Sequence, residues 1–143
     1  MRWSGLWVCG GLVLWMQLAQ AQPVPAVPQH PAVVATPPIC RTQPDSAACA
    51  AQTRHVLNRR LNQLYRLELQ KVMGTYTERR LGHAQNLWRR WANAECLFRW
   101  GPPSRGGADW QRHQDQCLSG MIRARIVQLA GFVHCAGATC PPP

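Results

Sequence analysis

The chain of 143 residues carries a formal net charge of +10 and seven cysteines, and its only long apolar run lies at the start. Nothing downstream approaches the length of a second membrane span, so a membrane protein with several spans is excluded. The positive charge would favour nucleic acid as the partner of a cytosolic protein, but the export signal at the start argues against nucleic acid.

Residues 1–21 have the three parts of a cleavable secretory signal peptide. Arg2 is the only early charge, residues 6–18 are apolar apart from one glutamine, and Ala19-Gln20-Ala21 supplies the small-x-small pattern of a cleavage site. The apolar run is too short to span about 30 Å of hydrocarbon comfortably, although an uncleaved anchor is the alternative. We therefore predict a protein of the periplasm or one that is secreted, not membrane-spanning, with 122 mature residues and a net charge of +9.

An even number of cysteines in a short exported chain indicates a disulfide framework. Six remain after cleavage: Cys40, Cys49, Cys96, Cys117, Cys135 and Cys140. A zinc site is the competing interpretation, but Cys135-x4-Cys140 beside His134 is the only candidate pair, and one loose pair cannot close a tetrahedral site. The sequence predicts no metal and no cofactor.

Residues 22–39 contain a proline every few positions, which favours extended conformations and excludes helix. We interpret this segment as a flexible tether, with a ligand for a groove-type binding protein as the alternative. The folded domain is then expected over residues 40–140.

A first helix is expected to begin after an N-cap at Asp45 or Ser46 and to run to about Met73, because Gly74 is a natural C-terminal position. Its apolar stripe, which predicts the face toward the core, is Leu57, Leu61, Leu64, Tyr65 and Val72.

A second helix is expected from Thr75, where Thr75-Tyr76-Thr77-Glu78 fits a capping box, to about Trp100, because the Gly101-Pro102-Pro103 sequence that follows cannot continue it. Its predicted inner stripe is Leu81, Ala84, Trp88, Trp91 and Ala92, with Glu95 on the same face.

A loop of glycine and proline over residues 101–108 precedes a third helix from Asp109 to about Val133. The predicted inner stripe of this helix is Leu118, Met121, Ile122, Leu129 and Phe132, with Arg125 in its middle. No strand-like alternation appears, so the sequence predicts an all-α fold, a small three-helix antiparallel bundle stapled by disulfides.

The predicted topology suggests which cysteines pair. An up-down-up bundle brings Cys96 and Cys117 together across the loop, and it places Cys40 and Cys49 at the same end. Cys135 and Cys140 lie at the other end. We expect the local pairs 40–49, 96–117 and 135–140, with a crossed arrangement of the four cysteines at the shared end as the rival.

Glu95 and Arg125 are polar residues on predicted buried faces, so we expect them to meet as a buried structural ion pair. A catalytic acid tuned by an arginine is the alternative, but no second carboxylate, histidine or nucleophile converges on Glu95 by its spacing. We predict that the protein is not an enzyme and has no catalytic residues.

The loop between the second and third helices carries the candidate binding residues. Trp100 and Trp110 flank it, together with Arg99 and Arg105, and aromatic residues with arginine are typical of a binding hot spot. The alternative is that both tryptophans cover the end of the bundle over the disulfides.

An ordered set of short motifs resembles the N-terminal domain family of the lysozyme inhibitor LprI. The motifs are Leu61-Asn62-x-x-Tyr65, Leu81-x-x-Ala84-Gln85-x-x-Trp88, Ala94-Glu95-Cys96, and Cys117-Leu118 with Arg125 and Leu129. The resemblance covers roughly residues 40 to 135 and implies an exported helical domain with disulfides. The chain departs from the family pattern at Trp91-Ala92, where a Tyr-Arg pair is common, and at Ile122, where a threonine is usual.

Two functions follow from these features. The resemblance implies an inhibitor of lysozyme or another cell-wall hydrolase, in which Arg99 or Arg105 on the loop would enter the acidic cleft of the enzyme. The alternative, favoured by the charge, is a basic module that binds anionic envelope polysaccharide or lipid. Salt distinguishes them, because binding through many cationic contacts fades steeply as ionic strength rises.

Overall fold

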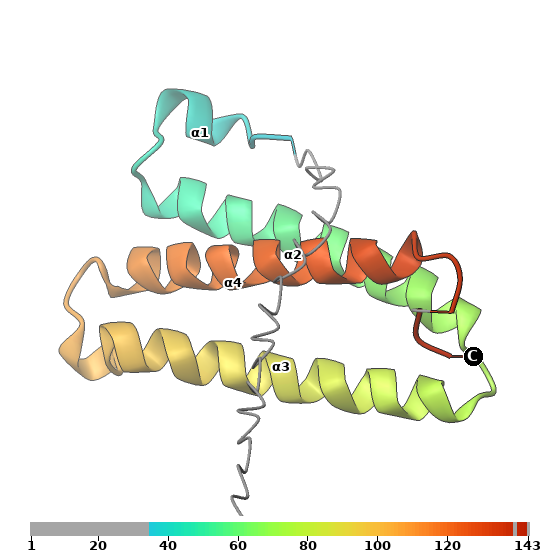
Figure 1. The fold of residues 1–143 in the computed structure, drawn as a ribbon. Helices are drawn as coiled ribbons and strands as arrows, with labels where there is room; N and C mark the ends of the chain where they lie inside the picture. The colour runs from blue at the N-terminus through green and yellow to red at the C-terminus, as the bar shows by residue number, and fades with distance from the viewer. Residues whose placement is uncertain (1–34, 139, 143) are drawn as a thin grey trace, which may run out of the picture.

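The described part of the chain is helical and forms an antiparallel bundle. The computed structural model describes residues 35–138 and 140–142, so the predicted signal peptide and most of the tether lie outside the described residues. Its elements are α1 (Ile39–Thr42), α2 (Ala47–Lys71), α3 (Tyr76–Trp100), the 3-10 turn η1 (Pro103–Arg105) and α4 (Trp110–Val133). The three long helices lie side by side, and α3 runs antiparallel to α2 and α4 (Figure 1), which confirms the predicted fold class. Among these residues no helix has the length and apolar character needed to cross a membrane.

Local chemistry sets the ends of the helices. The Ser46 hydroxyl accepts a hydrogen bond of 3.0 Å from the Cys49 amide and so caps α2. Gly74 and Gly101 have φ values of 77° and 71°, which stop α2 and α3 because L-residues with a side chain rarely adopt them. The predicted capping box at Thr75 is wrong in detail: the Glu78 carboxylate accepts from the Gly74 amide at 2.7 Å, one residue earlier than expected.

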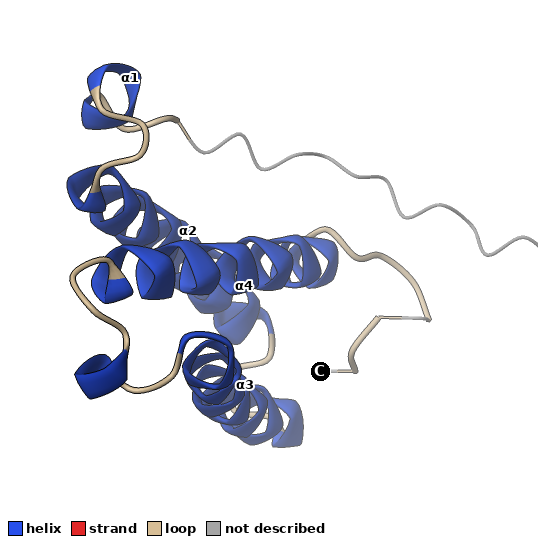
Figure 2. Cartoon of the chain, turned by 90° about the vertical axis from the view of Figure 1, so that its left-hand side faces the viewer, coloured by secondary structure: helices blue, strands red, loops and turns tan. Residues whose placement is uncertain are grey.

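The hydrophobic core lies mainly between α2 and α4. Leucines of α2 pack against apolar residues of α4, and all six are nearly inaccessible to solvent: Leu57, Leu61, Leu64, Ile122, Ile126 and Leu129. From α3, Leu81 and Trp88 pack on the edge of this cluster and are half-buried. Figure 2 shows α3 displaced to one side of the α2–α4 pair, so that much of its surface faces away from the bundle.

The inner face of α3 differs from the predicted one by a rotation of the helix. The structure buries Gln85, Ala92 and Cys96, whereas Ala84 is exposed and Trp91 keeps 56% of its surface exposed. Gln85 is tolerated in this position because its side-chain oxygen accepts a hydrogen bond of 3.0 Å from Arg125 Nε on α4. The prediction that Ala84 and Trp91 line the core is therefore wrong.

The expected Glu95–Arg125 ion pair is also wrong. Glu95 lies on the half-buried side of α3 and accepts two hydrogen bonds from Arg99, of 2.9 Å from Nε and 2.7 Å from Nη2. Arg125 bonds to Gln85 and Gln128 instead, and its guanidinium lies 5.9 Å from the centre of the Trp88 ring. Partial burial lowers the pKa of Arg125 from its usual value, and the partners of its guanidinium in the described part of the chain are neutral amides.

Two buried carboxylates, which the sequence did not predict, pair with basic residues where α2 meets α4. Asp115 on α4 is 1% exposed and forms an ion pair of 2.9 Å with Arg54 Nε on α2. Glu68 on α2 is 3% exposed and lies 3.2 Å from Lys71 Nζ, which also donates to the carbonyls of Phe132 and Val133 at the end of α4. A lysine there satisfies carbonyl groups that the helix leaves unpaired.

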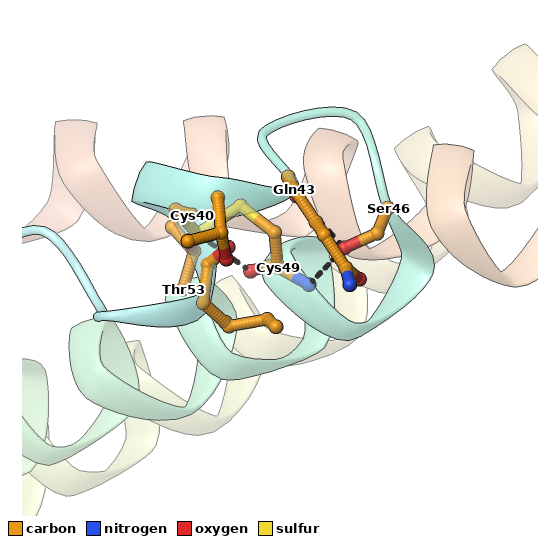
Figure 3. Close-up of a disulfide and its surroundings, with 7 residues drawn as sticks. Cys40, Gln43, Ser46, Cys49 and Thr53 are labelled. Carbon is orange, nitrogen blue, oxygen red and sulfur yellow. Dashed lines mark hydrogen bonds between the residues drawn. A yellow bond between two sulfur atoms is a disulfide. The ribbon is translucent and has the colours of Figure 1, made fainter.

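The three disulfides are the expected ones, in which each cysteine pairs with its neighbour along the chain. Cys40 joins Cys49, Cys96 joins Cys117, and Cys135 joins Cys140. The first fastens α1 to the start of α2, where Ser46 also donates to the Gln43 carbonyl at 2.9 Å (Figure 3). The second joins the end of α3 to the first turns of α4, and the third closes the segment after α4.

Candidate functional site

The loop between α3 and α4, residues 101–109, is fastened at its base by the Cys96–Cys117 disulfide. Cys96 is fully buried, and its Cα lies 5.8 Å from that of Cys117. This bridge holds the last turns of α3 against the first turns of α4, so both ends of the loop are anchored in rigid helices. A loop anchored in this way loses less conformational entropy when it binds a partner.

Trp110 and the glycines of the loop fix its path. The Trp110 indole Nε1 donates a hydrogen bond of 2.9 Å to the Gly101 carbonyl, which connects the two ends of the loop. Gly106 lies directly against the same indole, and a Cβ at this position would overlap the ring. Trp110 therefore serves as the internal support of the loop, and its ring is half-buried rather than freely presented to a partner.

Trp100 makes a second contact across the base of the loop. Its ring stacks on His113 of α4 with centroids 4.2 Å apart and planes inclined by 12°. Trp100 remains 44% exposed, so the outer face of the stacked pair is open to solvent. His113 is not among the predicted binding residues, although its position one helical turn after Trp110 could have indicated a neighbour of the loop.

The two candidate arginines occupy different environments. Arg99 lies on α3, and its guanidinium is already engaged by Glu95. Arg105 ends the η1 turn of the loop and is exposed, and within residues 35–138 and 140–142 it forms no ion pair. The structure thus places Arg105 in the loop that Trp100 and Trp110 flank, whereas Arg99 belongs to a separate ion pair on α3.

A groove of about 330 Å³ lies where α2, α3 and α4 meet. The apolar residues that line it are Leu61, Trp88, Ala92, Leu118 and Ile122. Two of its polar lining residues are joined by a hydrogen bond of 3.2 Å, which Arg89 donates to the Asn62 side chain. The residues described as lining it include no carboxylate, histidine, hydroxyl or thiol. Its polar residues are Arg54, Asn58, Asn62, Arg89 and Asn93. The arginines can only donate hydrogen bonds, whereas the asparagines can both donate and accept them.

Metal-binding side chains are not gathered anywhere in the described part of the chain, where no group of three or more His, Cys, Asp or Glu could hold an ion. The six cysteines within the described residues all form disulfides.

Comparison with known proteins identifies one family. The model of the family described as lysozyme inhibitor LprI matches residues 40–129, which include α2, α3, the loop and most of α4. No curated protein and no solved structure matches the chain.

Proposed function

The chain belongs to the lysozyme inhibitor LprI family, and on that basis we propose that it inhibits a lysozyme-type cell-wall hydrolase by inserting the loop of residues 101–109 into the enzyme's cleft. The observation that carries the proposal is that Arg105 is exposed at the end of the η1 turn, in a loop whose base is anchored by the Cys96–Cys117 bridge. Substrate clefts of glycoside hydrolases are concave and contain a pair of carboxylates. An exposed guanidinium that forms no ion pair within the described residues is complementary in charge to such a cleft.

Within this mechanism, Arg105 binds the catalytic carboxylates. A guanidinium can donate two parallel hydrogen bonds to a carboxylate, and this pair is strong where water is excluded. Occupation of the cleft by the loop prevents the polysaccharide from entering. Trp110, Gly106 and the Cys96–Cys117 bridge act as positioning groups, because they hold the turn in the conformation that enters the cleft.

The charge of the chain shapes the salt dependence of inhibition. Lysozymes of the animal type are strongly basic, so they are repelled at long range by a partner with a charge of +9 after removal of the signal peptide. Salt screens this long-range repulsion more than it weakens a desolvated contact inside a cleft. Inhibition is therefore expected to persist, or to strengthen, as ionic strength rises.

Replacing Arg105 with alanine is expected to weaken inhibition about a hundredfold, since a desolvated charge-assisted contact with a carboxylate is worth roughly 3 kcal/mol. The measurement is the inhibition constant for lysozyme-driven clearing of a cell-wall suspension. The matched control is Arg59→Ala, which removes the same charge from an exposed position on α2 and is expected to leave the constant unchanged. Equal inhibition by the Arg105→Ala variant and the unaltered protein would contradict the proposal that the loop enters the cleft.

Arg99→Ala separates the two candidate arginines. Because Arg99 is held by Glu95 on the helix, we expect its loss to change inhibition much less than the loss of Arg105. A larger effect from Arg99 would move the contact from the loop to the end of α3.

A further inference from the structure

The outward side of α3 carries a stripe of exposed apolar side chains, which we call the outer stripe and which consists of Tyr76, Leu87, Trp91 and Phe98. At 100° per residue, the four positions fall within about 60° of one another on the helix. They are 61%, 47%, 56% and 85% exposed, respectively. The stripe extends along almost the whole length of α3, and neither α2 nor α4 covers it.

Basic residues accompany the outer stripe. Arg79, His83 and Arg90 are exposed along one edge, and the Arg80 guanidinium lies 4.8 Å from the centre of the Tyr76 ring. On the opposite edge, the nearest acid is Glu95, whose charge is offset by Arg99. The stripe therefore combines large apolar side chains with an excess of positive charge.

We propose that α3 lies on the surface of an anionic lipid bilayer, with the outer stripe inserted at the boundary between headgroups and acyl chains. Helices with this composition, aromatic and leucine residues on one side and arginines beside them, lie in the plane of the membrane interface. Aromatic rings favour that boundary, and arginines at the edge can reach the lipid phosphates while their stems remain in the apolar layer. A convex ridge on one helix also suits a soft, flat surface.

A second copy of the chain is a poorer occupant of the outer stripe. It would bring its own Arg79 and Arg90 to the same seam, and like charges in close contact oppose association. An anionic bilayer meets the same residues with charge of the opposite sign, and the net charge of +9 after removal of the signal peptide adds to the attraction.

The test is co-sedimentation of the oxidised protein with vesicles of phosphatidylglycerol mixed with phosphatidylcholine, and with vesicles of phosphatidylcholine alone. We expect binding to the mixed vesicles and much weaker binding to the neutral ones. The Trp91→Ser/Phe98→Ser variant is expected to bind the mixed vesicles at least about tenfold more weakly, because two large side chains no longer enter the apolar layer. Both positions are exposed, and circular dichroism checks that the fold is kept.

Matched variants distinguish insertion of α3 from unspecific attraction. Leu67→Ser/Val127→Ser removes exposed apolar side chains from α2 and α4, and it is the control for the loss of apolar side chains from α3. Arg79→Gln/Arg90→Gln removes two positive charges from α3. Its control, Arg59→Gln/Arg66→Gln, removes two positive charges from α2. We expect only the α3 variants to lose binding. No vesicle binding, or equal losses in the α2 and α3 variants, would overturn the proposal.

Sedimentation equilibrium without lipid tests the other occupant. If the unaltered protein is a dimer and the Trp91→Ser/Phe98→Ser variant is a monomer, the outer stripe is the contact with a second copy, and the bilayer proposal is overturned. A monomeric unaltered protein supports the bilayer proposal. The Arg105→Ala variant is expected to keep full vesicle binding, so this proposal and the inhibitor function can fail separately.

Discussion

Replacing Cys96 and Cys117 together with alanine is expected to lower the free energy of unfolding by about 3 kcal/mol and to abolish most inhibition. The bridge joins residues 21 positions apart, and opening a loop of that size enlarges the conformational freedom of the unfolded chain. The same bridge anchors the loop that carries Arg105, so its removal also frees the proposed inhibitory turn. Denaturant unfolding under oxidising conditions gives the first quantity, and the inhibition constant gives the second.

The disulfide at the other end of the bundle is the matched control. Cys135 and Cys140 are only five positions apart, so their replacement by alanine is expected to cost less, about 2 kcal/mol. This change lies far from the loop and should leave inhibition intact. If both double variants reduced inhibition equally, the loss would reflect general destabilisation, and the loop would have no special role.

Replacing Arg54 with methionine is expected to lower the free energy of unfolding by about 3 kcal/mol, because it leaves the Asp115 carboxylate buried without its cationic partner. The expected cost lies at the lower end of such changes, since the Arg54 side chain is 39% exposed and water partly screens the pair. Methionine keeps most of the apolar stem, so the change isolates the charge. The midpoint and slope of urea unfolding measure the effect.

A second substitution shows whether the buried charge is the cause. The double variant Arg54→Met/Asp115→Leu removes both charges and should recover a large part of the lost stability. An unchanged midpoint for Arg54→Met, or a double variant less stable than the single one, would contradict the role assigned to the pair.

The helix ends and the disulfide pairing were predictable because they depend on local chemistry and chain order. Ser46, Gly74 and Gly101 act through their own backbone geometry and capping groups, whatever the rest of the fold does. Once three antiparallel helices are assumed, Cys135 and Cys140 lie at one end and the other four cysteines at the opposite end. That topology favoured the local pairs but left a crossed pairing of the four open, and the structure has the local pairs.

The rotation of α3 was not predictable from apolar spacing, because this helix has two apolar sides. Leu81, Trp88 and Ala92 define the inner side, and the outer stripe defines another that no helix covers. A polar residue, Gln85, stands at the centre of the inner side, where its side-chain oxygen accepts a hydrogen bond from Arg125. A prediction from hydrophobicity alone cannot tell which of the two apolar sides faces the core, and it therefore assigns Trp91 to the core.

The buried carboxylates did leave a signal in the sequence. Asp115 lies seven residues before Ile122, and Glu68 lies four residues after Leu64, so each continues an apolar stripe at helical spacing. Glu95 was assigned to Arg125 by burial alone, although Arg99 one turn later was a nearer partner. For the candidate site, the sequence identified Trp100, Arg105 and Trp110, but it could not show that Trp110 supports the loop from within or that His113 stacks on Trp100.

The most direct test of inhibition by an anchored loop is lysozyme-driven clearing of a cell-wall suspension, with and without the oxidised protein, at low and at high salt. The account predicts slower clearing that is as strong, or stronger, at the higher salt concentration, because salt screens the repulsion between two basic proteins. Unchanged clearing, or a slowing that disappears as salt is added, would contradict it.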